Sequence, residues 1–298
     1  MSVTVTETSN GSTTGGARER LLAGLPVTER RLEPAGIPTA VLEGGEGPPL
    51  VLLHGPGESG AKWLRVIPQL VESHRVVAPD LPAHGASAVP EEEVDDERIG
   101  DWLAELTGQT CSSPPTVVGH VLGGAIAARF AARRPTLLSR LVLVDSLGLA
   151  RFRPKPRFAL TMMAFLARPS ERSYERFMRQ CSYDLDGLRE EMGERWDPFV
   201  AYNLQGAKNS PGSKAVGRMM RKLGTPRIPE EELARIDVPT CLIWGREDRA
   251  NRVRIAERVS ERYGWPLHAI DDCADDPARD KPEEFVKALR ACLTAPAR

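Results

Sequence analysis

Residues 116–131 read Thr-Val-Val-Gly-His-Val-Leu-Gly-Gly-Ala-Ile-Ala-Ala-Arg-Phe-Ala, and this stretch decides the fold. Its first three residues have the character of a short buried strand. The last seven are good helix formers, and Gly123 and Gly124 let that helix begin close to the sheet. The glycines between strand and helix permit a sharp turn. The sequence therefore predicts a bend that lifts the side chain of Val121 above a sheet.

Short aliphatic runs of the same kind recur on both sides of this stretch. They lie at residues 49–54, 75–78, 141–144, 241–244 and 267–270, with helical stretches between them. Buried parallel strands have this pattern. Residues 27–32 and 38–42 resemble an antiparallel hairpin. Together these segments predict an α/β fold with a mostly parallel sheet of about eight strands and helices on both faces.

The recurring strand-like runs stop between residues 144 and 241, where the sequence instead has helical segments broken by prolines. This predicts a helical cap over residues 149–235, inserted after the sixth strand. Residues 21–148 and 236–298 then form the α/β core, and the Ser/Thr/Gly-rich residues 1–20 are expected to be a disordered tail. Flexible apolar side chains of the cap such as Met162 suit an adaptable pocket lining, and they equally suit an ordinary cap core.

Charge and hydropathy limit the partners of the chain. It has 40 Lys and Arg against 41 Asp and Glu, and neither sign forms a long block. We therefore expect no nucleic acid and no membrane as partner, but an apolar small molecule, with the chain as monomer or homodimer. Because an apolar run of about 18 residues and a signal-peptide core are both lacking, the sequence predicts a cytoplasmic location.

The five cysteines are widely spaced and none forms a Cys-x-x-Cys pair; they are Cys111, Cys181, Cys241, Cys273 and Cys292. We therefore expect neither a disulfide framework nor a zinc or other metal site. The glycine-rich segments lack the downstream acid of a dinucleotide-binding fingerprint, so no cofactor is expected.

At residues 119–123 the chain resembles the α/β-hydrolase family, whose common form at this place is Gly-x-Ser-x-Gly. Three more segments carry the resemblance: His54-Gly55-Pro56-Gly57 resembles the oxyanion loop, residues 80–87 the loop after the next strand, and Gly245-Arg246-Glu247-Asp248 the loop with the acid. The matching segments span residues 25–295. The resemblance implies the α/β-hydrolase fold, with Asp248 in the position of the family's acid.

The chain departs from the family pattern at three positions. Val121 stands where the serine nucleophile is expected, and valine has no atom that attacks a carbonyl. Asp275 stands where the two prolines of residues 277–282 place the family's histidine. Pro56 lacks the N–H that usually donates to the oxyanion, so Leu122 and Gly57 remain as backbone donors. The resemblance thus predicts the family's pocket without its Ser-His-Asp hydrolysis.

Asp248 and Asp275 are the candidate catalytic residues. The fold brings these two positions close together in the family, and two carboxyl groups at such a distance do not both ionise readily. One of them would hold a proton and the pair would act as general acid and base. The alternative is that Asp275 or Asp276 points to solvent or pairs with one of three arginines, Arg246, Arg249 or Arg279.

The candidate substrate-binding residues are Pro56, Gly57, Glu58, Val121, Leu122 and Met162. Glu58 also fits a surface position. His54, His84 and His120 lie in loops that carry structural histidines in the family, and His84 is the best candidate among them for a direct role. Asp145, at the end of a strand, is expected to bind loop backbone.

Three functions fit these observations. The first is a non-hydrolytic enzyme that tailors a natural product by acid/base and proximity catalysis, through cyclisation, C–C bond formation, isomerisation or elimination. Proximity alone contributes roughly 7–11 kcal/mol to such reactions, and the natural-product class is implied by the resemblance. The second is an inactive protein that binds a small ligand. The third is a residual hydrolase in which Asp275 or His84 activates water.

Overall fold

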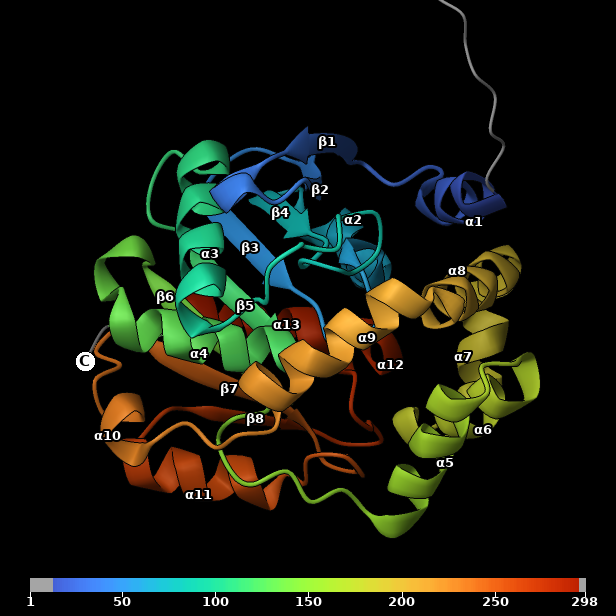
Figure 1. Ribbon diagram of the computed structural model, residues 1–298. Helices are drawn as coiled ribbons and strands as arrows, with labels where there is room; N and C mark the ends of the chain where they lie inside the picture. Colours follow the sequence, from blue (N-terminus) through green and yellow to red (C-terminus); the bar gives the residue numbers. More distant parts are fainter. Residues whose placement is uncertain (1–12, 295–298) are drawn as a thin grey trace, which may run out of the picture.

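The computed structural model describes residues 13–294, and a sheet of eight strands forms its centre (Figure 1). The strand order is β1-β2-β4-β3-β5-β6-β7-β8. β1 pairs antiparallel with β2, β2 pairs antiparallel with β4, and the other neighbours are parallel. The predicted hairpin and the mostly parallel sheet are thus confirmed. The bounds are β1 Thr28–Leu32, β2 Thr39–Gly44, β3 Pro49–Leu53, β4 Arg75–Pro79, β5 Thr116–His120, β6 Arg140–Val144, β7 Thr240–Gly245 and β8 Leu267–Ile270.

Helices cover both faces of the sheet, so the central strands are apolar on both sides. On one face α3 (Asp96–Thr110), α4 (Leu122–Arg133) and α11 (Arg254–Tyr263) bury alternate strand residues such as Val117 and Leu143. On the other face η2 (Gly60–Arg65), α2 (Ile67–Leu70) and α13 (Pro282–Thr294) bury the residues between them, such as Val118 and Val142. This double burial explains the continuous aliphatic runs in the sequence.

The segment between β6 and β7 is helical, as its sequence predicts. The elements are α5 Pro156–Ala167, α6 Glu171–Cys181, α7 Leu185–Met192, η4 Gly193–Arg195, α8 Trp196–Lys208, α9 Ser210–Met219, η5 Met220–Gly224 and α10 Glu230–Leu233. Helices α5 to α8 pack around a separate apolar cluster rich in Phe and Met side chains and lie to one side of the sheet in Figure 1. Residues of α9, η5 and α10 pack instead in the core beside α4. No described helix has the length and apolar character needed to cross a bilayer.

The N-terminal region differs from the expected tail over residues 1–20. Residues 1–12 lie outside the described part, but Thr13–Leu22 form helix α1, so the prediction is wrong for residues 13–20. The helix packs against α8. Arg18 pairs with Asp80 at 3.0 Å and Glu29 at 2.7 Å, and donates to the Tyr202 hydroxyl at 2.6 Å. The composition of the tail gave no sign of these long-range contacts, which order the helix.

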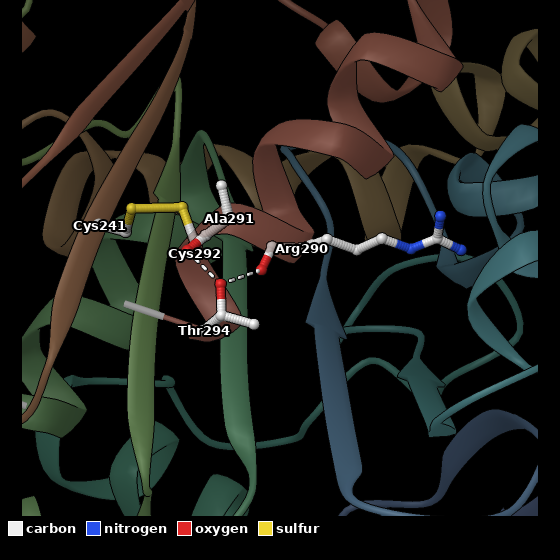
Figure 2. Close-up of a disulfide and its surroundings, with 5 residues drawn as sticks. All are labelled: Cys241, Arg290, Ala291, Cys292 and Thr294. Atoms are coloured by element: carbon white, nitrogen blue, oxygen red, sulfur yellow. Dashed lines mark hydrogen bonds between the residues drawn. A yellow bond between two sulfur atoms is a disulfide. The ribbon is translucent and has the colours of Figure 1, made fainter. Parts of the chain in front are cut away.

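A disulfide joins the sheet to the C-terminal helix, so the expectation of unpaired cysteines is wrong at one pair (Figure 2). Cys241 on β7 and Cys292 on α13 are bonded, with Cα atoms 5.8 Å apart, across 51 residues of sequence. Because the two cysteines are far apart in the sequence, the sequence did not predict their contact, which forms only when α13 packs on the sheet. The imidazole of His268 lies within 4.8 Å of both sulfurs. All three residues are of types that bind metal ions, but two sulfurs joined in a disulfide are not thiolates and therefore do not act as thiolate ligands.

Cleavage of this disulfide should destabilise the fold by about 2–4 kcal/mol, because the cross-link restricts the unfolded chain. Reduced wild type and a Cys292→Ser variant should both melt at a lower temperature in calorimetry. Cys111→Ser, which removes a free thiol, is the matched control. Titration of the denatured, unreduced protein should give three thiols, those of Cys111, Cys181 and Cys273. A count of all five would contradict the disulfide.

Candidate active site

The bend between β5 and α4 has a valine at its apex. Val121 has φ 49° and ψ −104°, a conformation that β-branched residues rarely adopt. Its N–H donates to the Val144 carbonyl at 3.0 Å, and its own carbonyl accepts from Leu147 N–H at 3.1 Å. Strand β6 and the loop after it therefore hold the strained backbone in place. The isopropyl group at the apex is only partly buried.

Close backbone contacts around this bend require glycine. A Cβ atom on Gly119 would lie 2.4 Å from the Gly123 carbonyl oxygen, and one on Gly123 would lie 2.5 Å from the Leu53 carbonyl oxygen. The Gly123 N–H donates to the His54 carbonyl at 3.1 Å, which joins the bend to the loop after β3. Leu122, predicted to bind substrate, is fully buried at the start of α4.

Pro56 and Gly57 occupy the centre of a tight turn after β3. The Glu58 N–H lies 3.4 Å from the Gly55 carbonyl, and Gly57 has φ 75°. Proline followed by a glycine with positive φ is typical of a type II turn. Gly57 is exposed at the tip. The loop therefore keeps the glycine turn expected of an oxyanion loop, while Pro56 has no N–H to donate.

Glu58 anchors this loop and links it to the segment around Asp275. Its Oε2 atom accepts the Gly55 N–H at 2.7 Å and lies 3.4 Å from Nδ1 of His120. Burial raises the pKa of Glu58, but the nearby Lys62 and His120 lower it by more than burial raises it. The pKa therefore lies below its usual range, and the carboxyl group is ionised. Nε2 of His120 lies 2.7 Å from the Asp275 carbonyl oxygen. His120 thus bridges the two loops.

Two other histidines are buried and neutral at pH 7. His54 accepts the Leu81 N–H at Nε2, at 2.9 Å, and burial lowers its pKa to about 3. Nδ1 of His84 lies 2.9 Å from the Pro82 carbonyl, and burial lowers the pKa of His84 to about 4. Nε2 of His84 is buried and has no hydrogen-bond partner in residues 13–294. His54 therefore has a structural role, and His84 has one ring nitrogen available.

Two buried carboxyl groups lie beyond the ends of β6 and β7. Asp248 Oδ1 accepts the N–H groups of Ala250 at 2.6 Å and Asn251 at 2.8 Å, and burial raises the pKa of Asp248 to about 7. Asp145 Oδ1 accepts the Gly245 N–H at 3.0 Å. Burial and the charge of Asp248 raise the pKa of Asp145 well above its usual range. In each carboxyl group Oδ2 is buried and accepts no hydrogen bond from an N–H group among the described residues, and the two side chains interact with one another.

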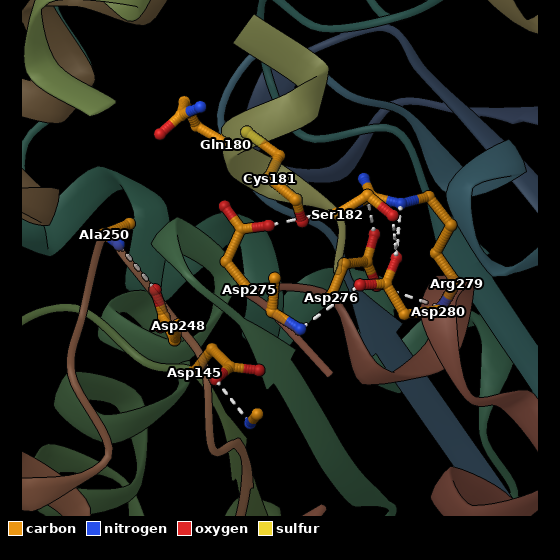
Figure 3. A network of polar contacts seen from close by, with 12 residues as sticks. Asp145, Gln180, Cys181, Ser182, Asp248, Ala250, Asp275, Asp276, Arg279 and Asp280 are labelled. Atoms are coloured by element: carbon orange, nitrogen blue, oxygen red, sulfur yellow. Dashed lines mark hydrogen bonds and ion pairs between the residues drawn. The ribbon is translucent and has the colours of Figure 1, made fainter. Parts of the chain in front are cut away.

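Asp275 is the third acid of this cluster (Figure 3). Burial, with a smaller contribution from the charge of Asp248, raises the pKa of Asp275 well above its usual range, while Arg279 lowers it. Arg279 Nη2 lies 3.6 Å from Asp275 Oδ1. The interaction of Asp275 with Arg279 is therefore present, and the pairing of Asp275 with Asp248 stays a prediction. Buried carboxyl groups that repel one another retain protons at neutral pH.

Sequence reasoning missed Asp145 as a member of this cluster. The expected bond to loop backbone is present, but the second carboxyl oxygen is not used by it. Asp145 is the first residue after β6, in a positive-φ conformation (φ 43°). A polar residue at the carboxyl end of a central parallel strand was the available signal, because such ends converge on the site in α/β sheets.

Arg279 organises the buried charges beside this cluster (Figure 3). Its guanidinium lies 3.2 Å from Asp276 and 3.3 Å from Asp280, and donates to the Cys181 carbonyl at 2.7 Å. Lys62 pairs with Asp276 at 2.9 Å. Burial raises the pKa of Asp276, but Lys62 and Arg279 lower it by more, so the pKa lies below its usual value. Asp276 is therefore an ionised group with two cationic partners and not a solvent-facing one.

A small cavity of about 20 Å³ lies beside Glu58 and has room for a single water molecule. Its walls are more polar than the apolar lining expected from the sequence: Leu21, Glu58, Ser59, Ala61, Lys62, Phe199, Tyr202, Asn203, Asp276 and Arg279. Met162 is half-buried and packs against the apolar cluster of α5 and α6. The substrate-binding roles of Met162, Val121 and Leu122 stay predictions.

A family model described as "alpha/beta hydrolase fold" matches residues 48–275. The chain belongs to this family, as the resemblance in its motifs implied. A pimeloyl-[acyl-carrier protein] methyl ester esterase of Chromobacterium violaceum is 30% identical over 82% of this chain and 94% of its own length. A 2-hydroxy-6-oxo-6-(2'-aminophenyl)hexa-2,4-dienoic acid hydrolase of Metapseudomonas resinovorans is 26% identical over 89% of this chain and 91% of its own length.

Solved structures show the same fold at lower sequence identity. A membrane phospholipase A superposes with a TM-score of 0.80 at 24% identity and covers 94% of this chain and 90% of its own. A meta-cleavage product hydrolase of Pseudomonas fluorescens superposes with a TM-score of 0.76 at 22% identity and covers 91% of this chain and 98% of its own.

Asp248→Asn should flatten the pH dependence of stability between pH 4 and pH 7. The folded-state pKa of Asp248 is about 7 against an ordinary value of 3.8. The folded protein thus holds a proton that the unfolded chain has released. The stability from this proton is complete below pH 4 and is lost as the pH rises through 7, at about 1.4 kcal/mol per pH unit.

Thermal melts of the wild type and the variant across this pH range measure the effect. Asp237→Asn, at an exposed position, is the matched control and should keep the wild-type slope. Equal slopes in the wild type and in Asp248→Asn would show that Asp248 ionises at its ordinary pH.

Val121→Gly should stabilise the fold by about 1 kcal/mol, because glycine adopts this backbone conformation without strain. Such strain costs about 1–3 kcal/mol, and the greater freedom of glycine in the unfolded chain offsets part of the gain. Urea denaturation compares the variant with Val121→Ala, which retains a Cβ atom at positive φ and hence most of the strain. A lower midpoint for the glycine variant than for the alanine variant would disprove the strain.

Proposed function

We propose that this protein is a non-hydrolytic enzyme of the α/β-hydrolase family that acts on an apolar small molecule by proton transfer, without a covalent intermediate. The observation that carries the proposal is the valine at the apex of the strand-to-helix bend. Its isopropyl group forms no acyl or alkyl bond with a substrate. With Asp275 in the position proposed for the histidine, the chain lacks both partners of serine-type hydrolysis.

The carboxyl cluster supplies the acid and the base. Asp248, with a pKa of about 7, is close to the value at which a group both accepts and releases protons at neutral pH. Asp145 and Asp275, with pKa values raised well above the usual range, hold protons beside it. We assign Asp248 as the base that removes a proton and Asp275 as the acid that returns one. Burial raises the pKa of Asp248, and its interaction with the side chain of Asp145 lowers that pKa in part.

The names of the relatives suggest a type of substrate on which such a cluster acts. Two of them are named as hydrolases of 2-hydroxy-6-oxo-dienoic acids. Such a molecule is a conjugated enol, and moving one proton from its hydroxyl group to carbon converts it to the keto isomer of the same mass. That step needs an acid, a base and a fixed geometry, but no nucleophile. Isomerisation, cyclisation, C–C bond formation and elimination in natural-product tailoring all belong to this class.

The test uses the 2-hydroxy-6-oxo-dienoic acid named for the Metapseudomonas resinovorans relative as a probe, in D₂O. Mass spectrometry should show deuterium gained on carbon and no product that has gained the mass of water. Asp248→Asn and Asp275→Asn should each slow the deuterium uptake by about 10²–10⁴-fold, the usual contribution of a general acid or base. Asp237→Asn should leave the rate unchanged.

Cleaved product carrying the mass of water would overturn the proposal, and so would a covalent adduct on the bend after treatment with a fluorophosphonate. Unchanged deuterium uptake in both Asn variants would refute the assignment of the two acids.

The second candidate function is the binding of a small ligand without turnover. The observation in its favour is that Arg279 and His120 contact the Asp275 segment directly, at 3.6 Å and 2.7 Å. These contacts give Asp275 a structural reason to be where it is. A melting temperature that rises with the probe, combined with no deuterium uptake, would favour this function over the enzyme.

A further inference from the structure

Helix α5 is apolar on two opposite sides. Its inner side carries Phe158 and Phe165, which are buried and contact the ring of Phe177 at centroid distances of 5.4 Å and 5.7 Å. Phe165 also contacts the ring of Tyr174 on α6. These contacts fix the helix on its neighbours. The outer side is therefore not needed to hold α5 in place.

The outer side of α5 carries the three most exposed large apolar residues of the described chain. Leu160 is 63% exposed, Met163 is 55% exposed and Leu166 is 62% exposed. Ala164 and Ala167 are exposed between them. Spacings of three and four residues bring these side chains onto one face of a helix. We call this face the outer α5 face. A contiguous apolar surface of this kind marks an interaction site.

Unpaired cations flank the outer α5 face. Residues 146–170 contain five cations and no acid, in a chain whose net charge is −1; the cations are Arg151, Arg153, Lys155, Arg157 and Arg168. All five are exposed, and none forms an ion pair within residues 13–294. Exposed arginines elsewhere include paired ones, such as Arg179 with Asp186 and Glu175, and ones without an ion pair among the described residues, such as Arg254. What sets this segment apart is five cations without an acid. The nearest acid along the chain after this segment is Glu171.

We propose that the outer α5 face and its flanking cations dock on the surface of an anionic lipid bilayer. An interfacial helix places apolar side chains among the acyl chains while Lys and Arg contact the phosphates, and this segment has both groups in that arrangement. The proposal departs from the expectation of no membrane partner. That expectation relied on the overall charge balance, which hides a cationic segment interrupted by Phe152, Pro154 and Pro156.

The charges favour a bilayer over a second copy of the chain. A twofold contact through the outer α5 face would bring two sets of five cations together, and like charges across an interface are unfavourable. In Figure 1, α5 lies with α6 and α7 to one side of the sheet, and the residues of its outer face are exposed. The proposal is independent of the chemistry assigned to the carboxyl cluster.

The experiment is flotation of the full-length protein with vesicles of phosphatidylcholine alone and of phosphatidylcholine with phosphatidylglycerol. We expect binding to the anionic vesicles at least tenfold tighter than to the neutral ones, and weaker binding at high salt, because each cation near the surface adds electrostatic attraction. Leu160→Ser combined with Met163→Ser should reduce binding to anionic vesicles at least tenfold. Arg153→Glu combined with Lys155→Glu should do the same.

The matched control for the charge reversal is Arg254→Glu combined with Arg258→Glu, on exposed positions of α11, and the control for the apolar change is Leu137→Ser. Both should bind like the wild type, and all variants should keep the wild-type melting temperature, because the changed side chains are exposed. Equal binding to neutral and anionic vesicles, or equal loss in the α11 control, would overturn the proposal. So would a dimer in sedimentation that Leu160→Ser dissociates while vesicles are not bound, or binding only to an acidic protein.

Discussion

One backbone constraint positions everything at the site: β5 turns into α4 within van der Waals contact of the neighbouring strands. The carbonyls of Leu53 and Gly123 occupy the space that side chains at Gly123 and Gly119 would need. Val121 is therefore held at φ 49° although valine disfavours that conformation. The geometry belongs to the packed sheet and not to the residue at its apex. The bend therefore stays in place whichever side chain stands at its apex.

Because the residue at the apex of the bend is a valine, the charged side chains are the main reactive groups of the site. Beyond the strand ends Asp145 and Asp248 are buried and Asp275 is partly buried, and only part of their charge is compensated. Arg279 and Lys62 neutralise the neighbouring Asp276 first, at 3.2 Å and 2.9 Å, and Arg279 reaches Asp275 at 3.6 Å. Asp248 has two backbone donors on one oxygen and none on the other. The interior therefore holds protons at neutral pH, which is the property on which the proposed acid/base role relies.

The sequence was sufficient for the parts of the fold that local pattern determines. Aliphatic runs, the front hairpin and the glycine bend are local signals, and the sheet confirms them. Contacts between distant segments gave no local signal. Helix α1 depends on Arg18 meeting Asp80, the disulfide depends on Cys292 meeting a strand 51 residues away, and Asp145 joins the acids only through the sheet order. Which charged groups are buried, and hence which pKa values are shifted, likewise cannot be predicted from a linear pattern of residues.

Helix α1 also explains why the cavity at the site is so small. Leu21 from α1 and Tyr202 from α8 form part of its wall, and the space left is about 20 Å³. Arg18 holds both elements at once, because it donates to the Tyr202 hydroxyl and pairs with Asp80 of the core. Both Arg18 and Asp80 are buried, so separating them would leave an uncompensated charge in the interior, which is costly. The ion pair therefore makes α1 a fixed wall of the cavity beside Glu58 and not a disordered appendage.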